Sequence, residues 1–146
     1  MIMNRIKIVL SIFAFLFAVM QANAQSFRLN DLVGKTWTGV SGYYGCDVMS
    51  WSISFGEKNA IHRGIDKKGK DIATFSYNMY LSNNVPKKYD DSLLGKSQSG
   101  KYIVFERKYD HEGRTVEDFQ TYEIISLTSN KLVVKSNGLT ITFVAK

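Results

Sequence analysis

The chain has 146 residues, a single cysteine and a formal net charge of +6. Its lysines and arginines are spread among acidic residues, without the concentration on one element that nucleic-acid binding needs, so no nucleic-acid partner is expected. The lone Cys46 excludes an intramolecular disulfide, and we expect its thiol to be buried or partly buried, the alternative being a disulfide to another chain.

The N-terminus has the pattern of a secretory signal peptide. Two basic residues precede the apolar run 8–20, and Ala22-Asn23-Ala24 supplies the small-x-small pattern that signal peptidase recognises. We expect residues 1–24 to be removed by cleavage after Ala24, which places the protein in the periplasm or outside the cell. The run of 13 residues is too short to cross ~30 Å of hydrocarbon, so no transmembrane segment is expected. Residues 25–146, with 17 basic and 13 acidic side chains, are expected to form one domain.

The remaining sequence predicts an all-β domain. Residues 29–33 suit one helical turn that closes an end of the fold, and from residue 35 apolar and polar residues alternate between closely spaced turns. The clearest alternation lies in 71–81, where the odd-numbered residues from Ala73 to Leu81 are apolar. The expected strands are 35–40, 48–55, 60–65, 71–81, 101–109, 115–127, 131–136 and 139–145.

Several strands carry more specific expectations. The serines at positions 50, 52 and 54 predict a solvent-facing side for the second strand. Four apolar residues in a row, Tyr102–Phe105, indicate a strand covered on both faces. The alternation in 115–127 slips, which predicts a β-bulge near Gln120 or Thr121. Alternate residues of the last strand, including Leu139, are expected to point inward.

Eight strands joined mostly by tight turns predict an antiparallel up-and-down barrel, because closure removes exposed strand edges. The strongest hairpin signal is Asn137-Gly138 near the C-terminus. Two connections are long, 41–46 and 82–100, and long loops in a compact domain are often functional. In a barrel these two loops are expected to lie over a mouth.

The segment Leu32-Val33-Gly34-Lys35-Thr36-Trp37, at the head of eight strands, resembles the start of a lipocalin-like domain. The segments 122–128, 131–135 and 89–103 are similar to small secreted lipocalin-like proteins of Gram-negative bacteria. The resemblance covers residues 25–146 and implies a barrel that opens with a helical turn and whose first-strand tryptophan, Trp37, plugs the closed end. It implies a fold, and a fold does not fix a function.

No catalytic motif is present. The sequence has no Gly-x-Ser-x-Gly, phosphate-binding loop or dinucleotide fingerprint, and no metal-ligand spacing. His111 lies in a turn and is expected to be solvated, while His62 is expected to be structural. Glu117 and Asp118 are adjacent in a strand and therefore point to opposite faces, and Asp90 suits a cap of the following turn. No catalytic residue, metal or cofactor is expected.

Aromatic residues are the best indication of function, and they allow two interpretations. Inward aromatic side chains either fill a packed core or line a cup for one small apolar or amphipathic molecule. The expected lining residues are Trp51, Phe75, Tyr77, Met79 and Tyr102, with Tyr43 and Tyr44 near the mouth.

The alternative function is a protein-interaction or inhibitor module with a packed barrel, acting through the loops 41–46 and 82–100. Tyr43, Tyr44 and Tyr89 suit such a surface, because tyrosine buries a large area at low entropic cost. An enzyme is a third possibility, and it would need polar groups that converge in the cavity.

Overall fold

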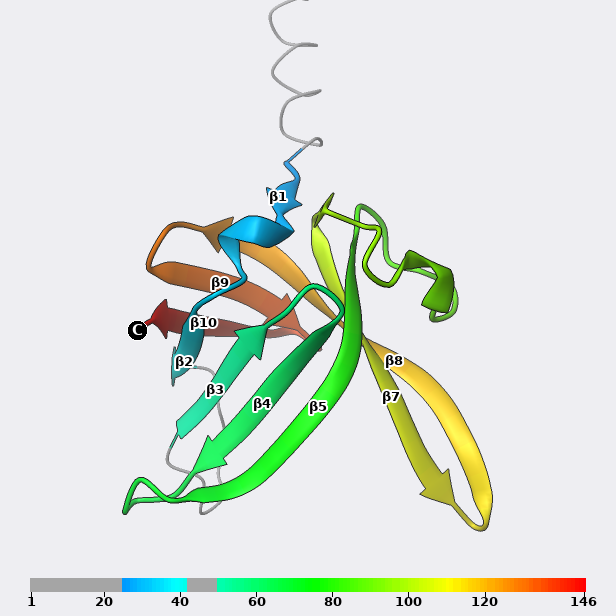
Figure 1. Ribbon diagram of the computed structural model, residues 1–146, viewed down its shortest axis with the longest axis horizontal. Coiled ribbons are helices and arrows are strands. Elements are labelled where there is room, and N and C mark those ends of the chain that lie inside the picture. Colours follow the sequence, from blue (N-terminus) through cyan, green and yellow to red (C-terminus); the bar gives the residue numbers. More distant parts are fainter. Residues whose placement is uncertain (1–24, 42–49) are drawn as a thin grey trace, which may run out of the picture.

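The computed structural model describes residues 25–41 and 50–146. Eight antiparallel strands form a closed barrel in the order β10-β2-β3-β4-β5-β7-β8-β9, and β1 and β6 form a separate two-stranded sheet (Figure 1). The elements are β1 (Phe27–Arg28), η1 (Leu29–Asp31), β2 (Thr36–Ser41), β3 (Ser50–Phe55), β4 (Asn59–Ile65), β5 (Asp71–Ser82), η2 (Asp91–Leu93), β6 (Ser99–Gly100), β7 (Tyr102–His111), β8 (Arg114–Leu127), β9 (Lys131–Ser136) and β10 (Leu139–Ala145). The predicted eight-stranded antiparallel barrel is confirmed. Within the described ranges, no helix has the length and hydropathy needed to cross a membrane.

Two hairpins follow from residues that adopt positive φ. The β9–β10 hairpin turns at Asn137 and Gly138, with φ of 49° and 78°, as the Asn-Gly signal predicted. The β7–β8 hairpin turns at Glu112 and Gly113, with φ of 50° and 74°. Positive φ at both central residues is the condition for a two-residue turn whose twist matches that of the strands.

One end of the barrel is closed by the 3-10 turn η1, as the sequence predicted. Leu29 and Leu32 lie there with no more than 1% of their surface exposed, and Trp37 of β2 is fully buried. The Trp37 indole Nε1 donates a hydrogen bond to the Leu32 carbonyl oxygen at 2.9 Å, which ties the turn to the barrel wall. The core continues through buried apolar residues of all eight barrel strands. They include Ile53, Ala60, Leu81, Ile103, Ile124, Leu132 and Phe143.

Gly100 of β6 lies against the backbone of Ser82. A Cβ at position 100 would stand 2.5 Å from the Ser82 nitrogen and 2.7 Å from its oxygen, closer than real Cβ contacts come. We expect Gly100→Ala to lower the free energy of unfolding by about 1–3 kcal/mol, because backbone cannot move aside as a flexible side chain can. Urea denaturation checks this, with the neighbouring exposed Ser99→Ala as the control. Equal stability of the two variants would contradict it.

Three sequence expectations are corrected. Ser52 is buried at 7% exposure, so the serine side of β3 is not a solvent-facing surface. The predicted bulge near Gln120 or Thr121 is absent, because β8 pairs with β7 without a break from Arg114 to Glu123. The bulge of β8 lies between Ile124 and Ser126, where its pairing with β9 shifts register. Leu139 is 42% exposed, because it begins β10 beyond the packed core.

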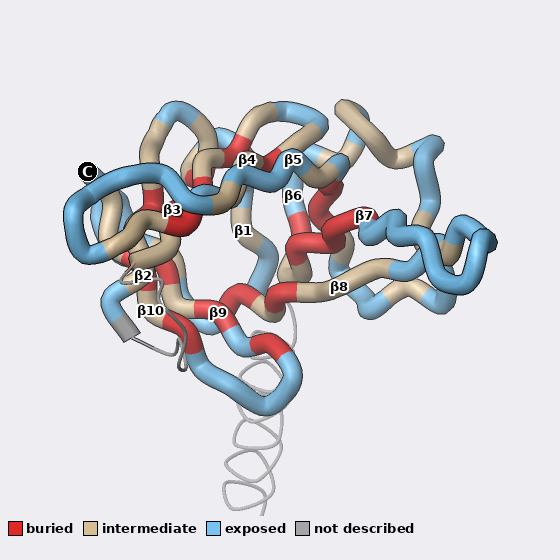
Figure 2. The backbone as a smooth tube through the Cα atoms, turned by 90° about the horizontal axis from the view of Figure 1, so that it is seen from below, coloured by how far each residue is buried: buried red, intermediate tan, exposed pale blue. Residues whose placement is uncertain are grey.

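The barrel wall is split on one side. β5 and β7 pair only where Met79–Ser82 meets Tyr102–Phe105. Beyond this point β5 continues beside β4, while β7 turns away with β8 as a projecting hairpin (Figure 1). The outer part of this hairpin is exposed, whereas the barrel interior is lined by buried segments (Figure 2). We call the space between the two diverging strands the fork. Among the described residues, no helical turn closes the end of the barrel opposite η1 (Figure 1), and we call this end the open end.

Candidate functional site at the open end of the barrel

A cluster of rings lies inside the barrel where the fork begins. His62 of β4 contacts Tyr77 of β5 and Phe105 of β7 edge-to-face, with ring centroids 5.1 Å and 5.3 Å apart. Tyr122 of β8 packs on Phe105 at 4.9 Å, and Phe75 stacks on Tyr77 at 6.2 Å. Four neighbouring strands therefore contribute to one aromatic surface, which we call the ring cluster.

The ring cluster passes from buried to exposed along the barrel axis. Phe105 and Tyr122 are buried, with 3% and 7% of their surface exposed, whereas Phe75 is 47% exposed. Phe75 shares the inward face with Tyr77 but lies where β5 has no partner on its β7 side. An apolar ligand that entered at the open end would meet Phe75 first.

His62 is the polar group of this cluster. Its Nε2 atom is buried and has no hydrogen-bond partner. Burial lowers the pKa of His62 from 6.5 to about 4, so the imidazole is neutral at pH 7. A neutral imidazole nitrogen without a partner can accept or donate one hydrogen bond, depending on its tautomer.

Tyr122 contributes a second perturbed group to the cluster. Burial, followed by the proximity of Tyr77, raises the pKa of the Tyr122 hydroxyl to about 12. The cluster contains no carboxylate, lysine or arginine side chain, and its histidine is neutral at pH 7. Such a surface suits a neutral, mainly apolar molecule.

On the outer side of the cluster, a groove of about 400 Å³ occupies the fork. It is lined by residues 74–78 of β5 and by Glu106 and Lys108 of β7. Asn78 Nδ2 donates to Glu106 Oε2 at 2.8 Å, and Lys108 Nζ lies 2.6 Å from Glu106 Oε1. Burial acts to raise the pKa of Glu106, but the hydrogen bonds from Lys108 and Asn78 outweigh it and hold this pKa below its ordinary value.

Three predicted lining residues lie on the interior face. Trp51 pairs with Gly64 of β4, and its six-membered ring lies so close that a Cβ at Gly64 would stand 3.1 Å from it. Met79 is fully buried in the core beneath the ring cluster. Tyr77 is half-buried against the same core.

Other predicted lining residues are placed differently. Tyr102 points to the outer face, because alternation puts it opposite the core residues Ile103 and Phe105, and Lys101 Nζ lies 5.7 Å from its ring centroid. Phe75 is on the predicted face but is not enclosed, because β7 has already left the wall. Tyr43 and Tyr44 lie outside the described residues, as do Cys46 and the predicted signal peptide.

Sequence reasoning missed His62, Phe105 and Tyr122 as members of this site. His62 was expected to be structural because a lone histidine in a strand gives no chemical signal. The one signal in the sequence is the alternation of the expected strand 60–65, which puts His62 on the same face as the apolar Ala60.

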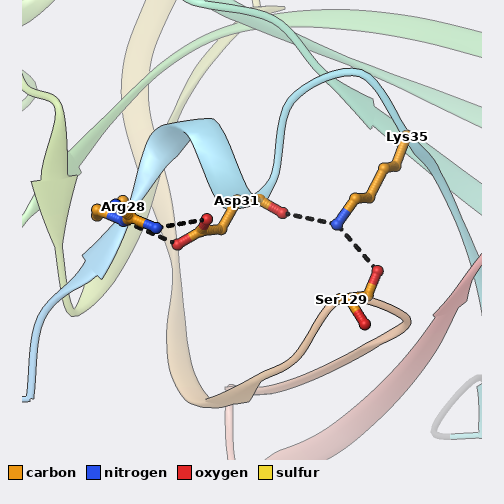
Figure 3. A network of polar contacts seen from close by, with 4 residues as sticks. All are labelled: Arg28, Asp31, Lys35 and Ser129. Carbon is orange, nitrogen blue, oxygen red and sulfur yellow. Dashed lines mark hydrogen bonds and ion pairs between the residues drawn. The ribbon is translucent and has the colours of Figure 1, made fainter.

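A second groove, of about 390 Å³, lies at the closed end beside η1. Its cations are already engaged, as Figure 3 shows. Arg28 makes two contacts of 3.1 Å with the Asp31 carboxylate, and Lys35 Nζ donates to the carbonyl oxygens of Ser129 at 2.9 Å and Asp31 at 3.4 Å. The Lys35 ammonium also lies 5.3 Å from the centroid of the Trp37 ring. These contacts hold the turn onto the barrel, so we interpret this region as structural.

The long connection 82–100 packs on the outer wall and does not cover the open end. Tyr89 lies on Tyr80 of β5 with ring centroids 5.2 Å apart, and Tyr80 and Val104 are buried on the outer face. The prediction that the strand 102–105 is covered on both faces is confirmed for its outer face at Val104, which is fully buried. Asp90 Oδ1 accepts hydrogen bonds from the Ser92 backbone nitrogen at 3.0 Å and its hydroxyl at 2.6 Å, which confirms the predicted cap.

In the described ranges, no three histidine, cysteine, aspartate or glutamate side chains group as metal ligands would. Comparison with known proteins gives no family to which the chain can be assigned. No protein-family model matches the sequence, and neither the curated proteins nor the solved structures contain a match.

Proposed function

We propose that the protein is an exported, non-catalytic binding protein for one small apolar or amphipathic molecule, held at the open end of the barrel. The observation that carries this proposal is the ring cluster, which combines an exposed aromatic entrance at Phe75 with an unpartnered polar atom at His62 Nε2. Apolar surface of the ligand would be buried on Phe75 and Tyr77, and one polar group of the ligand would pair with His62. Residues 1–24 would direct the export.

The alternative, an interaction module acting through its long loops, has less support. Tyr89, which this hypothesis used as a contact residue, has a buried hydroxyl and packs against Tyr80 on the outer wall of the barrel. The other loop lies outside the described residues. We therefore favour the ligand-binding function.

Phe75→Ala is expected to weaken binding of the neutral fluorescent probe N-phenyl-1-naphthylamine about five- to tenfold. The variant removes the ring that a ligand would bury first, a loss of roughly 1–1.4 kcal/mol. A titration followed by probe fluorescence measures the change.

The matched control is Ile125→Ala. Ile125 is 45% exposed, close to the 47% of Phe75, but it lies in the bulge of β8. Its substitution should leave probe binding unchanged. Absence of probe binding to the unmodified protein, or equal weakening by both variants, would refute the site.

A further inference from the structure

The fork exposes backbone hydrogen-bonding groups on its β5 side. Met79 N donates to Lys58 O at 2.9 Å, so odd-numbered residues in this part of β5 direct their backbone groups toward β4. Along an antiparallel strand these directions alternate. Thr74, Ser76 and Asn78 therefore direct their N–H and C=O groups away from β4 and into the fork.

The β7 side of the fork is exposed in the same way. Ile124 N donates to Lys101 O at 2.8 Å, so the odd-numbered residues of β7 direct their backbone groups toward β8. Glu106, Lys108 and Asp110 direct theirs into the fork. Two strand edges thus face each other without pairing.

A side-chain bridge marks the point where the two edges separate. The last backbone pairs are Met79–Phe105 and Tyr80–Val104, and immediately beyond them Asn78 and Glu106 are joined only by their side chains at 2.8 Å. The next residues across the fork, Ser76 and Lys108, line the groove of about 400 Å³. Beyond the Asn78–Glu106 bridge, the two edges are therefore separated by an open groove that their side chains do not fill.

The two edges differ in charge. Residues 72–80 of β5 contain no charged side chain, and Phe75 among them is 47% exposed. The β7 edge carries four charged residues between positions 106 and 110. Proteins ordinarily protect a free edge with charges, bulges or a covering segment. The free edge of β7 is protected by its charged side chains. Residues 74–78 of β5 carry no charge, and the one irregularity near them is a register shift at residues 71–73.

We propose that the free edge of β5 binds an uncharged, extended peptide segment of a partner protein by strand addition, which fills the fork. The backbone of the segment would pair with Thr74, Ser76 and Asn78. Its inward side chains, at alternate positions, would be apolar and pack on Phe75 and Tyr77. A single added strand can enter the fork. A second copy of the protein that paired through its own β5 would also bring its β4, which is paired with β5, against β7 of the first copy. This partner is recognised through backbone groups, so the inference does not rest on a ligand at His62.

Amide hydrogen exchange followed by nuclear magnetic resonance tests this inference on the full chain. In the free protein, the amides of Thr74, Ser76 and Asn78 should exchange fast, while those of Phe75 and Tyr77, paired with β4, should be protected. The probe is a soluble peptide in which valine and threonine alternate between terminal lysines. Addition of the peptide should slow the exchange of the three fast amides, so that all five amides of residues 74–78 are protected.

Ser76→Pro is the variant that removes the central donor of the edge, and Ser76→Ala is its matched control. Proline is tolerated on edge strands because the lost N–H is not part of the sheet. We expect about tenfold weaker peptide binding for the proline variant, and unchanged binding of N-phenyl-1-naphthylamine for both. If the proline variant does not fold, a peptide N-methylated on its β5-facing amides should fail to bind the unmodified protein.

Three outcomes would overturn the inference. The first is protection of the Thr74, Ser76 and Asn78 amides in the free, dilute protein. The second is protection that rises with protein concentration without peptide, which would assign the edge to a second copy of the chain. The third is a peptide effect confined to the Phe75 and Tyr77 side chains, which would indicate occupancy of the interior alone.

Discussion

Replacing Trp37 with alanine is expected to lower the free energy of unfolding by about 3–5 kcal/mol. The side chain is fully buried in the same core cluster as Leu29 and Leu32. Its removal would leave a cavity at the closed end and would also leave the Leu32 carbonyl without its 2.9 Å donor. An unpaired buried carbonyl costs about 1–3 kcal/mol in its own right.

Circular dichroism during urea denaturation measures this loss without relying on tryptophan fluorescence. Trp37→Phe retains most of the packing but not the indole N–H, so its smaller loss isolates the hydrogen bond and remains measurable if the alanine variant does not fold. Trp51→Ala is the control, because Trp51 is only partly buried. A loss below about 1 kcal/mol for Trp37→Ala would show that η1 and β2 do not depend on this side chain.

The second large effect is a loss of stability on acidification that originates from His62. In the folded protein burial lowers the His62 pKa to about 4, whereas the unfolded chain has the ordinary value of 6.5. Between these two pH values the unfolded chain binds a proton that the folded protein does not, so unfolding becomes easier as pH falls. The penalty is absent well above pH 6.5, reaches about 2 kcal/mol near pH 5 and levels at about 3 kcal/mol below pH 4.

The rings that contact His62 belong to Phe105, Tyr77 and Tyr122, so no carboxylate or amine is among its ring contacts. His62→Phe keeps an aromatic ring in place and should abolish this component, so its stability should exceed that of the unmodified protein by an amount that grows as pH falls. Ile125→Ala, which changes an exposed side chain and no ionisable group, is the control and should leave the pH dependence unchanged. Parallel curves for the unmodified protein and His62→Phe between pH 7 and pH 5 would refute the assignment.

Much of the fold could be predicted because alternation is a local property of the sequence. The strand 71–81 was recognisable from its own side chains, and the turn at Asn137 and Gly138 from two residues. Neither signal says how far a strand remains paired with its neighbour. The fork at Met79 and Phe105 therefore could not be foreseen, and with it the exposure of Phe75.

The candidate site was harder to predict, because it depends on which face of a strand meets the interior. In the apolar run Tyr102–Phe105 the sequence does not distinguish the inner from the outer face, and the prediction that Tyr102 points inward is wrong. Tyr102 shares the outer face with Val104, which is buried there under the connection 82–100. Similarly, nothing in the sequence around His62 indicates that three strands bring Tyr77, Phe105 and Tyr122 to its ring.

The closure of the barrel joins β2, its first strand along the chain, to β10, its last, with Thr38 opposite Val144. Pairing of such distant segments requires a large loop to close before any contact is gained, which slows folding. During synthesis from the N-terminus, β2 has only β3 as a barrel neighbour until β10 has been made. The barrel wall therefore cannot close before β10 is available, so closure is a late step in the folding of this domain.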